Sequence, residues 1–230
     1  MKCIILAAGE GVRMQPLTND TPKPMLKVAG KPILEHILDD LPEQVDEIIL
    51  VVGYLKEKII DYFGDKFNRF NIQYVFQAEK LGTFNALKLC EDLVSDGEKF
   101  LMMYADDLHG AENLKKCVDS DLSAMLVYEA EDPSRFGVVE VNQEGYITGI
   151  EEKPEHPKSN LVSIGVILLD KDIFQFPARK HPNGEYYLTD SIKQMIEHGY
   201  KFKAVQSSMW IPIGYPSDLA RAEEVLNRNL

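Results

Sequence analysis

Three observations predict a three-layer α/β/α protein built on a mixed, mostly parallel central sheet. Short apolar runs alternate with longer amphipathic segments in the first half of the chain, which is typical of βα units. Strand-like runs joined by short polar turns fill much of the second half. The chain has 230 residues, of which 45% are hydrophobic and 27% charged, so it can bury a sizeable core and is not expected to be disordered.

Four apolar runs are expected to form the first strands of the sheet, namely residues 2–7, 47–53, 71–77 and 99–105. The segments between them, 31–41, 55–67 and 82–94, carry apolar residues at helical spacing. In the first of these segments Ile33, Ile37 and Leu41 share one face. This order predicts helices that cross over between parallel strands.

The pattern changes after Asp107. Strand-like runs are expected at 123–130, 135–142, 145–152 and 161–169, followed by a helix at 188–198, a strand at 201–206 and a helix from about 216 to 229. Asn142-Gln143-Glu144-Gly145 is a typical turn sequence. No change in composition marks a linker, so we expect one domain over 1–230, grown from two halves at 1–107 and 108–230.

The charge and the cysteines exclude several classes of protein. The formal net charge is −12 and no basic block occurs, which disfavours a nucleic-acid or anionic-membrane partner. Cys3, Cys90 and Cys117 lack metal or redox spacing and lie in apolar segments, so reduced, packed thiols are expected. The apolar run 3–8 is too short for a signal-peptide core, and no run reaches the length of a membrane span, so a cytoplasmic location is expected.

A glycine loop follows the first strand. The sequence Ala8-Gly9-Glu10-Gly11 would let backbone N–H groups approach a phosphate, although such a short pattern also occurs in simple tight turns. Arg13 follows the loop, and Lys23 lies between two prolines that stiffen the backbone. The spacings of a P-loop and of a dinucleotide fold are both absent. We therefore expect a phosphate-binding loop of another kind.

Five ordered motifs resemble those of the sugar-1-phosphate nucleotidylyltransferases. They are L-A-A-G-E-G-V-R-M-Q-P-L-T with T-P-K-P-M (6–18 and 21–25), Q-A-E-K-L-G-T (77–83), Y-A-D (104–106), E-E-K-P (151–154) and G-E-Y-Y-L-T-D (184–190). The resemblance covers nearly the whole chain and implies a Rossmann-like fold of the nucleotide-diphospho-sugar transferase type. It also implies that 1–107 is the nucleotide-binding half and 108–230 the sugar-phosphate-binding half.

The resemblance implies a reaction and assigns catalytic roles. A sugar 1-phosphate would attack the α-phosphate of a nucleoside triphosphate and release pyrophosphate. Arg13 and Lys23 would bind the phosphates, Asp106 would hold Mg²⁺, and Lys153 would bind the phosphate of the sugar 1-phosphate. The remaining nucleotide contacts would be Leu6, Ala8, Gly9, Gly11, Gln77, Gly82 and Thr83, and the sugar-phosphate contacts Gly137, Glu152, Ser163 and Thr189.

The substrates stay partly open. Gln77 and the backbone of Gly82 could read the imide edge of uracil or thymine, which favours UTP or dTTP, with glucose 1-phosphate as the first sugar phosphate to test. Mannose 1-phosphate guanylyl transfer, phosphocholine cytidylyl transfer and an inactive nucleotide-sugar sensor are the alternatives. The chain lacks the hexapeptide repeats that some relatives append, so no acyltransferase activity is expected. The sequence leaves the oligomeric state open, and the five histidines are expected to be non-catalytic.

The chain departs from the family pattern in its last third. Relatives commonly read W-x-D-x-G, with the aspartate as a second Mg²⁺ ligand, whereas this chain has Pro212 at that position. Asp107 is expected in a turn or cap, and Asp218 at the start of the last helix. Phe84 stands where relatives usually have a small residue and would either alter the base pocket or pack in a helix. We expect a working enzyme with weakened metal affinity.

Overall fold

A parallel four-stranded unit forms the first half of the central sheet. The computed structural model describes residues 1–228. The strands β1 (Lys2–Ala7), β4 (Glu47–Val52), β6 (Phe70–Phe76) and β7 (Lys99–Tyr104) lie in the order β7-β1-β4-β6, and each neighbouring pair is parallel. The crossovers contain α1 (Ile33–Asp39), α2 (Lys56–Phe63) and α3 (Thr83–Lys88). The predicted βα units are therefore confirmed.

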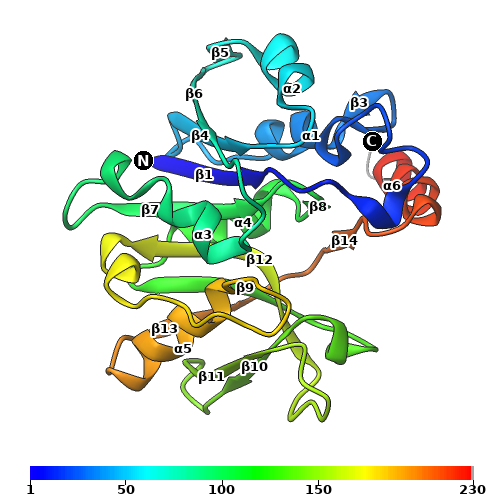
Figure 1. Ribbon diagram of the computed structural model, residues 1–230. Helices are drawn as coiled ribbons and strands as arrows, with labels where there is room; N and C mark the ends of the chain where they lie inside the picture. Colours follow the sequence, from blue (N-terminus) through cyan, green and yellow to red (C-terminus); the bar gives the residue numbers. More distant parts are fainter. Residues whose placement is uncertain (229–230) are drawn as a thin grey trace.

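The sheet changes direction at β12 (Leu161–Asp170), which pairs antiparallel with β7. β10 (Gly137–Val141) and β11 (Ile147–Glu152) form a hairpin beyond β12, while β9 (Ser123–Glu129) also pairs with β12 and carries β13 (Phe202–Gln206) as a parallel neighbour. The short strand β5 (Lys66–Phe67) closes the opposite edge. The result is one mixed sheet of ten strands, which continues through both halves of the described chain (Figure 1).

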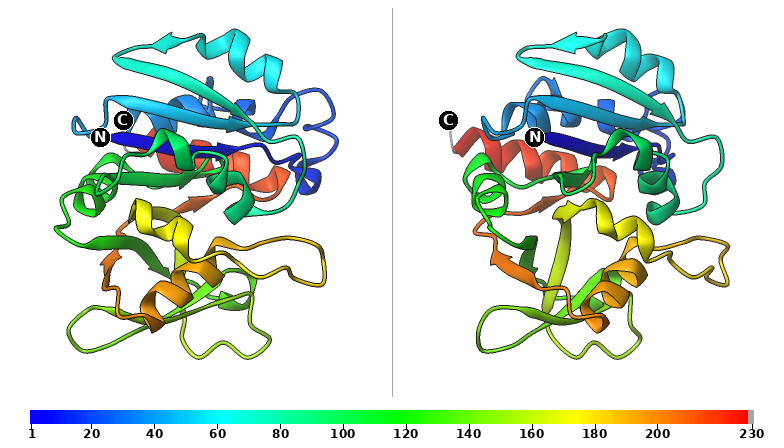
Figure 2. Two further views of the ribbon diagram at one scale, coloured as in Figure 1. Left: turned by 60° about the vertical axis from the view of Figure 1, so that its left-hand side comes forward. Right: turned by 90° about the vertical axis from the view of Figure 1, so that its left-hand side faces the viewer.

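Side chains of the central strands alternate between two apolar layers, because successive residues of a strand point to opposite faces. In β1, Cys3 and Ile5 pack in one layer and Ile4 in the other. The first layer is covered by α1, α2, α4 (Ala111–Val118) and α6 (Pro216–Arg228), and the second by α3 and α5 (Leu188–Glu197). Figure 2 shows α4 and α6 on one side of the sheet and α3 and α5 on the other. This is the expected three-layer arrangement.

Several short elements were not predicted. The helix α4 is not among the elements expected from the sequence, although Leu114, Cys117 and Val118 give it a buried face. The expected helix 82–94 is shorter, since α3 ends at Lys88 and a 3₁₀ turn, η3 (Glu91–Leu93), follows. The other short elements are η1 (Val12–Met14), η2 (Lys23–Met25), β2 (Lys27–Val28), β3 (Lys31–Pro32), β8 (Asp107–Leu108), η4 (Pro133–Arg135), η5 (Lys171–Gln175) and β14 (Ile211–Pro212).

Two other expectations concern the cysteines and the membrane. Cys3, Cys90 and Cys117 are buried and unpaired, and burial raises the pKa of each thiol, to about 12 for Cys90 and Cys117. They are core residues, as expected. Over residues 1–228, no helix has both the length and the apolar character that a bilayer span requires.

Leu168 tests the importance of the junction between the two halves. It is fully buried in β12, opposite Leu101 of β7 and Ala124 of β9. We expect Leu168→Ala to lower the free energy of unfolding by about 2–5 kcal/mol, because it removes packed methyl groups and leaves a cavity. Unfolding of both variants is measured by guanidinium titration. Leu89→Ala is the control, because Leu89 is 44% exposed, and should change the free energy of unfolding by less than about 0.5 kcal/mol. Equal effects would contradict this view of the junction.

Candidate functional site

The carboxyl ends of the four parallel strands meet at one edge of the sheet, where ligands of open α/β sheets usually bind. The glycine loop follows β1, Gln77 follows β6, and Asp106 lies two residues after β7. Gly53, which follows β4, lets the backbone there pack closely on the glycine loop, since a Cβ on it would lie 3.0 Å from Ala8. The topology thus brings together three of the motifs found in the sequence.

The glycine loop is packed against Lys23. Gly11 has φ +62°, and a Cβ on it would lie 2.9 Å from Lys23 Cβ. The hydroxyl of buried Thr18 donates a hydrogen bond to the Gly11 carbonyl at 2.9 Å. Lys23 is only 7% exposed, and its Nζ lies 2.7 Å from Asp106 Oδ2. This ion pair joins the loop to the end of β7.

The segment after β6 docks on the second half of the chain through its backbone. The N–H of Tyr186 donates to the Leu81 carbonyl at 2.8 Å, and the Phe84 N–H donates to the Tyr186 carbonyl at 3.0 Å. A Cβ on Gly82, which has φ +90°, would lie 2.6 Å from that carbonyl oxygen, so only glycine fits. Gln77 Nε2 donates to the Gly82 carbonyl at 3.4 Å, while its own N–H is bonded to Val52.

Phe84 is 6% exposed and packs in the second apolar layer, so it belongs to the core of α3. Of the two predictions made for Phe84, packing in a helix is the one confirmed.

The sugar-phosphate motif lies at the open end of the β10–β11 hairpin, where Gly137 pairs with Glu152. Thr189 Oγ1 donates to Glu152 Oε2 at 3.3 Å, so the first turn of α5 contacts the hairpin. Lys153 has φ +45°, a conformation that non-glycine residues seldom adopt. Its N–H donates to the Phe136 carbonyl, and its Nζ lies 3.5 Å from Glu152 Oε1.

Tyr104 lies between the two sets of motifs. Its ring packs against Gly165, where a Cβ would lie 2.4 Å from Cδ2. Burial raises the pKa of the Tyr104 phenol above its usual range, and the negative charges of Glu152 and Asp106 add to this rise, while a hydrogen bond with Thr83 opposes it. Thr83 Oγ1 in turn accepts the Leu188 N–H at 3.0 Å. The role of Tyr104 could not be predicted from the sequence, although this residue lies within the Y-A-D motif.

Asp107 holds the segment that contains Pro212. Its Oδ2 accepts the Trp210 indole N–H at 3.0 Å and its Oδ1 accepts the Ile213 N–H at 3.1 Å. Residues 107 and 212 are opposite each other in the antiparallel β8–β14 pair. Burial and the charge of Asp106 raise the pKa of Asp107 to about 7, although both hydrogen bonds favour the carboxylate. The expectation of a simple turn or cap role for Asp107 was wrong, because its side chain joins two strands.

The acidic side chains near Asp106 offer one carboxylate for a metal. Asp106 has 37% of its side chain exposed, whereas Asp107 is engaged by Trp210 and Ile213. Asp218 lies in the first turn of α6, as the sequence predicted. Its Oδ2 accepts the N–H groups of Gly214 and Tyr215, which precede the helix, both at 2.8 Å. In residues 1–228 no group of three His, Cys, Asp or Glu side chains could hold an ion. Such a site fits Mg²⁺ only if substrate phosphates supply further oxygens.

The other expected site residues are placed less directly. Arg13 lies on η1 and is exposed, with its guanidinium carbon 5.5 Å from the centre of the Tyr215 ring. Leu6 lies near the end of β1, whose parallel neighbour Tyr104 ends β7. Ser163 lies on β12, before a break in the β9–β12 register. Leu6 and Arg13 thus lie on either side of the glycine loop, and Ser163 lies on the strand next to β10.

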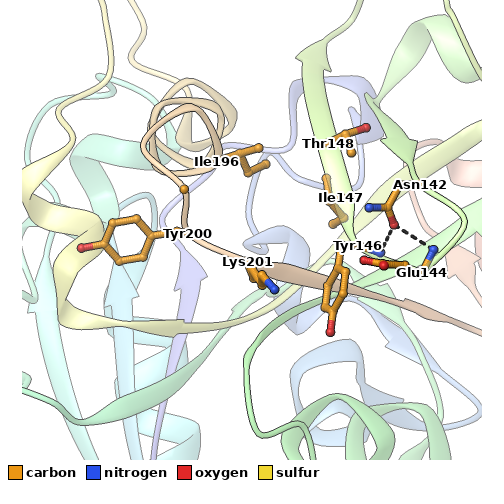
Figure 3. A pocket seen from close by; sticks show the side chains of 9 residues that line it. Asn142, Glu144, Tyr146, Ile147, Thr148, Ile196, Tyr200 and Lys201 are labelled. Atoms are coloured by element: carbon orange, nitrogen blue, oxygen red, sulfur yellow. Dashed lines mark hydrogen bonds between the residues drawn. The ribbon is translucent and has the colours of Figure 1, made fainter.

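A separate groove lies between the turn of the β10–β11 hairpin and the end of α5 (Figure 3). It has a volume of about 290 Å³ and is lined by Tyr146, Lys201 and residues around them in the β10–β11 turn and at the end of α5. Gly137 and Glu152 lie at the other end of the same hairpin, and Thr189 at the other end of α5. This groove is therefore not part of the candidate site.

The sequence profile of the family described as "Nucleotidyl transferase" matches residues 2–229. A bifunctional protein GlmU of Methanocaldococcus jannaschii is 39% identical over 98% of this chain, but the match covers 54% of that protein. The chain thus spans about half the length of this relative. A UTP–glucose-1-phosphate uridylyltransferase, AglF, of Haloferax volcanii is 38% identical over 98% of this chain and 96% of its own length.

A solved structure resembles the fold over the full chain. It is that of a putative glucose-1-phosphate thymidylyltransferase from Bacillus anthracis in complex with a sucrose, with a TM-score of 0.84 and 27% sequence identity. The superposition covers 100% of this chain and 96% of that chain. The predicted fold class is therefore confirmed.

The roles of Asp106 and Asp107 can be separated with Trp210, the one tryptophan in the sequence. We expect Asp107→Ala to shift the Trp210 emission and to lower stability by about 1–3 kcal/mol, because the indole and Ile213 N–H groups lose their acceptor. Asp106→Ala removes the neighbouring carboxylate but leaves the acceptor of the indole in place, so it should shift the emission far less than Asp107→Ala does. A spectral shift in the Asp106 variant alone would contradict the observed hydrogen bonds.

Proposed function

Because this chain belongs to the nucleotidyl transferase family, we propose that it transfers a nucleotidyl group from a nucleoside triphosphate to a sugar 1-phosphate, giving a nucleotide sugar and pyrophosphate. UTP or dTTP and glucose 1-phosphate are the favoured substrates. The similarity to AglF supports uridylyl transfer, and the similarity to the putative thymidylyltransferase supports the alternative base. In this proposal residues 1–107 bind the nucleotide and 108–230 the sugar phosphate.

The observation that carries the proposal is the position of Lys23. It is a buried cation beside the glycine loop, paired with the carboxylate that ends the Y-A-D motif. A lysine so buried in a chain of net charge −12 needs a specific partner, and phosphate oxygens would supply further ones. Lys153 supplies a second cation from the other half, next to Glu152. Each half of the chain thus offers a cation to one of the two anionic substrates.

The residues perform the reaction by positioning and by charge stabilisation. An oxygen of the sugar phosphate forms a bond to the α-phosphorus while the bond from that phosphorus to the oxygen bridging to the β-phosphate breaks, and pyrophosphate leaves. Lys153 holds the attacking phosphate, and Lys23 stabilises the charge that develops on the α-phosphate. Arg13 binds the phosphates that depart. Glu152 accepts hydrogen bonds from sugar hydroxyls, and Gly137 keeps the backbone beside the sugar open.

Asp106 is the residue that would hold Mg²⁺ together with the triphosphate. The ion, when bound, neutralises phosphate charge and orients the phosphate oxygens. Pro212 has no ligand atom in its side chain, so this chain offers one carboxylate fewer than the W-x-D-x-G pattern.

The first prediction concerns the substrates and is the direct test of the proposal. Pyrophosphate release is measured for five nucleoside triphosphates, each with glucose, mannose and N-acetylglucosamine 1-phosphates and with phosphocholine. We expect UTP or dTTP to exceed CTP, ATP and GTP by at least about tenfold, the value of one good hydrogen bond to the base. A preference for GTP with mannose 1-phosphate, or for CTP with phosphocholine, would replace the favoured substrates. Absence of turnover with every pair would support the sensor.

A second prediction separates the two cationic residues. Lys153→Ala should raise the KM for the sugar phosphate far more than the KM for the triphosphate, because Lys153 lies in the sugar-phosphate motif. Arg13→Ala should lower kcat whichever substrate is varied. Steady-state kinetics with each substrate varied in turn measure both effects. Equal and mild effects of the two substitutions would refute these assignments.

The third prediction concerns the metal. We expect Pro212→Asp to reduce the Mg²⁺ concentration needed for half-maximal activity, because it adds a carboxylate opposite Asp107, the residue that follows Asp106. Titration of Mg²⁺ against pyrophosphate release, for both the natural chain and the variant, measures the change. Pro212→Ala is the matched control and should leave the metal requirement as it is. An unchanged requirement in the aspartate variant would mean that residue 212 does not face the metal.

A further inference from the structure

The ring of Tyr215 is in contact with two arginines that come from different halves of the chain. The guanidinium carbons of Arg13 and Arg135 each lie 5.5 Å from the centre of this ring. The two charged groups are therefore separated by no more than twice that distance. Arg13 belongs to η1, beside the glycine loop, and Arg135 to η4, directly before the β10 strand.

The position of Tyr215 is fixed from both sides along the chain. Asp107 accepts the Ile213 N–H, and Asp218 accepts the N–H groups of Gly214 and Tyr215. Arg135 also contacts a second ring, since its guanidinium carbon lies 5.9 Å from the centre of the Phe136 ring. The Phe136 ring in turn packs edge-on against Trp210, with 5.0 Å between the ring centres. A continuous row of aromatic rings and arginines thus leads from Trp210 to Arg13.

Neither arginine is neutralised by an acidic side chain. Within the described part of the chain no carboxylate lies at ion-pair distance from Arg13 or Arg135, and both side chains are exposed. Both guanidinium groups therefore carry a positive charge that no side chain of the described residues balances. An aromatic ring orients a guanidinium while leaving its N–H donors free for phosphate oxygens.

We propose that Arg135 is a second pyrophosphate-binding residue, and that Tyr215 is a positioning residue that aligns Arg135 with Arg13 across the mouth of the site. The inference rests on the proposed function, because it takes Arg13 as a ligand of the departing phosphates. Arg135 and Arg13 share the Tyr215 ring, so Arg135 would contact the pyrophosphate that Arg13 binds, whereas Lys153 would contact the sugar phosphate. Bidentate binding by both guanidinium groups suits a compact anion of high charge.

The reverse reaction gives the sharpest test, because pyrophosphate is then a substrate whose KM can be measured apart from that of the nucleotide sugar. With UDP-glucose as the second substrate, we expect Arg135→Ala to raise the KM for pyrophosphate by about tenfold or more and to change the KM for UDP-glucose by less than about twofold. Tyr215→Leu should act in the same direction, and Tyr215→Phe should retain the properties of the natural chain because the ring remains. Arg221→Ala, which removes an exposed arginine from α6, is the charge-matched control and should have no effect.

Several results would overturn the inference. An unchanged pyrophosphate KM in Arg135→Ala, or an equal rise in both KM values, would show that Arg135 does not bind this anion selectively. A loss in Tyr215→Phe equal to that in Tyr215→Leu would refute the role of the ring. If the natural chain does not turn over at all, the proposed function fails instead, and calorimetric titration of inorganic pyrophosphate into the natural chain and Arg135→Ala then decides the inference alone: weaker binding by the variant supports it, and equal binding or none overturns it.

Discussion

The ion pair between Lys23 and Asp106 is the contact on which the arrangement of the site depends. It joins a rigid Pro-Lys-Pro segment to the end of the β7 strand, and the glycine loop packs directly on the same lysine. Burying a charge is costly unless it is paired, so each member of the pair keeps the other in place. The pair also places a cation, Lys23, directly beside a carboxylate, Asp106. A site that binds two phosphate-containing substrates and a divalent ion requires both kinds of charge side by side.

Much of the fold could be predicted from the sequence because its strands are buried on both faces. Runs such as 47–53 and 99–105 consist almost entirely of apolar residues, and strands β4 and β7 coincide with them closely. The helix α4 was not predicted because polar residues separate its few apolar ones, Leu114, Cys117 and Val118, so that its apolar face is small. The strands β8 and β14 have two residues each, too few for any periodicity to appear.

The site was predictable where it depends on a contiguous motif and not where it depends on pairs distant in the chain. Lys23 and Asp106 could be named from their neighbours in the sequence, and the structure places them 2.7 Å apart. The role of Asp107 could not, because its partners Trp210 and Ile213 are more than a hundred residues away. The same holds for Tyr215 and Arg135, whose meeting depends on how the last segment crosses the sheet. Exposed arginines have no pattern that distinguishes a ligand contact from ordinary surface charge.

The docking of the 81–84 segment on Tyr186 has a consequence for altering this protein's selectivity. Both hydrogen bonds between them use backbone atoms, and Gly82 approaches the Tyr186 carbonyl too closely for any side chain. Changes that reshape the loop carrying Gln77 and Gly82 will therefore displace the backbone that leads into α5 and Thr189. Libraries intended to change the base or the sugar alone will therefore have to vary the 77–84 loop and the segment before α5 together, because the conformation of each depends on the other.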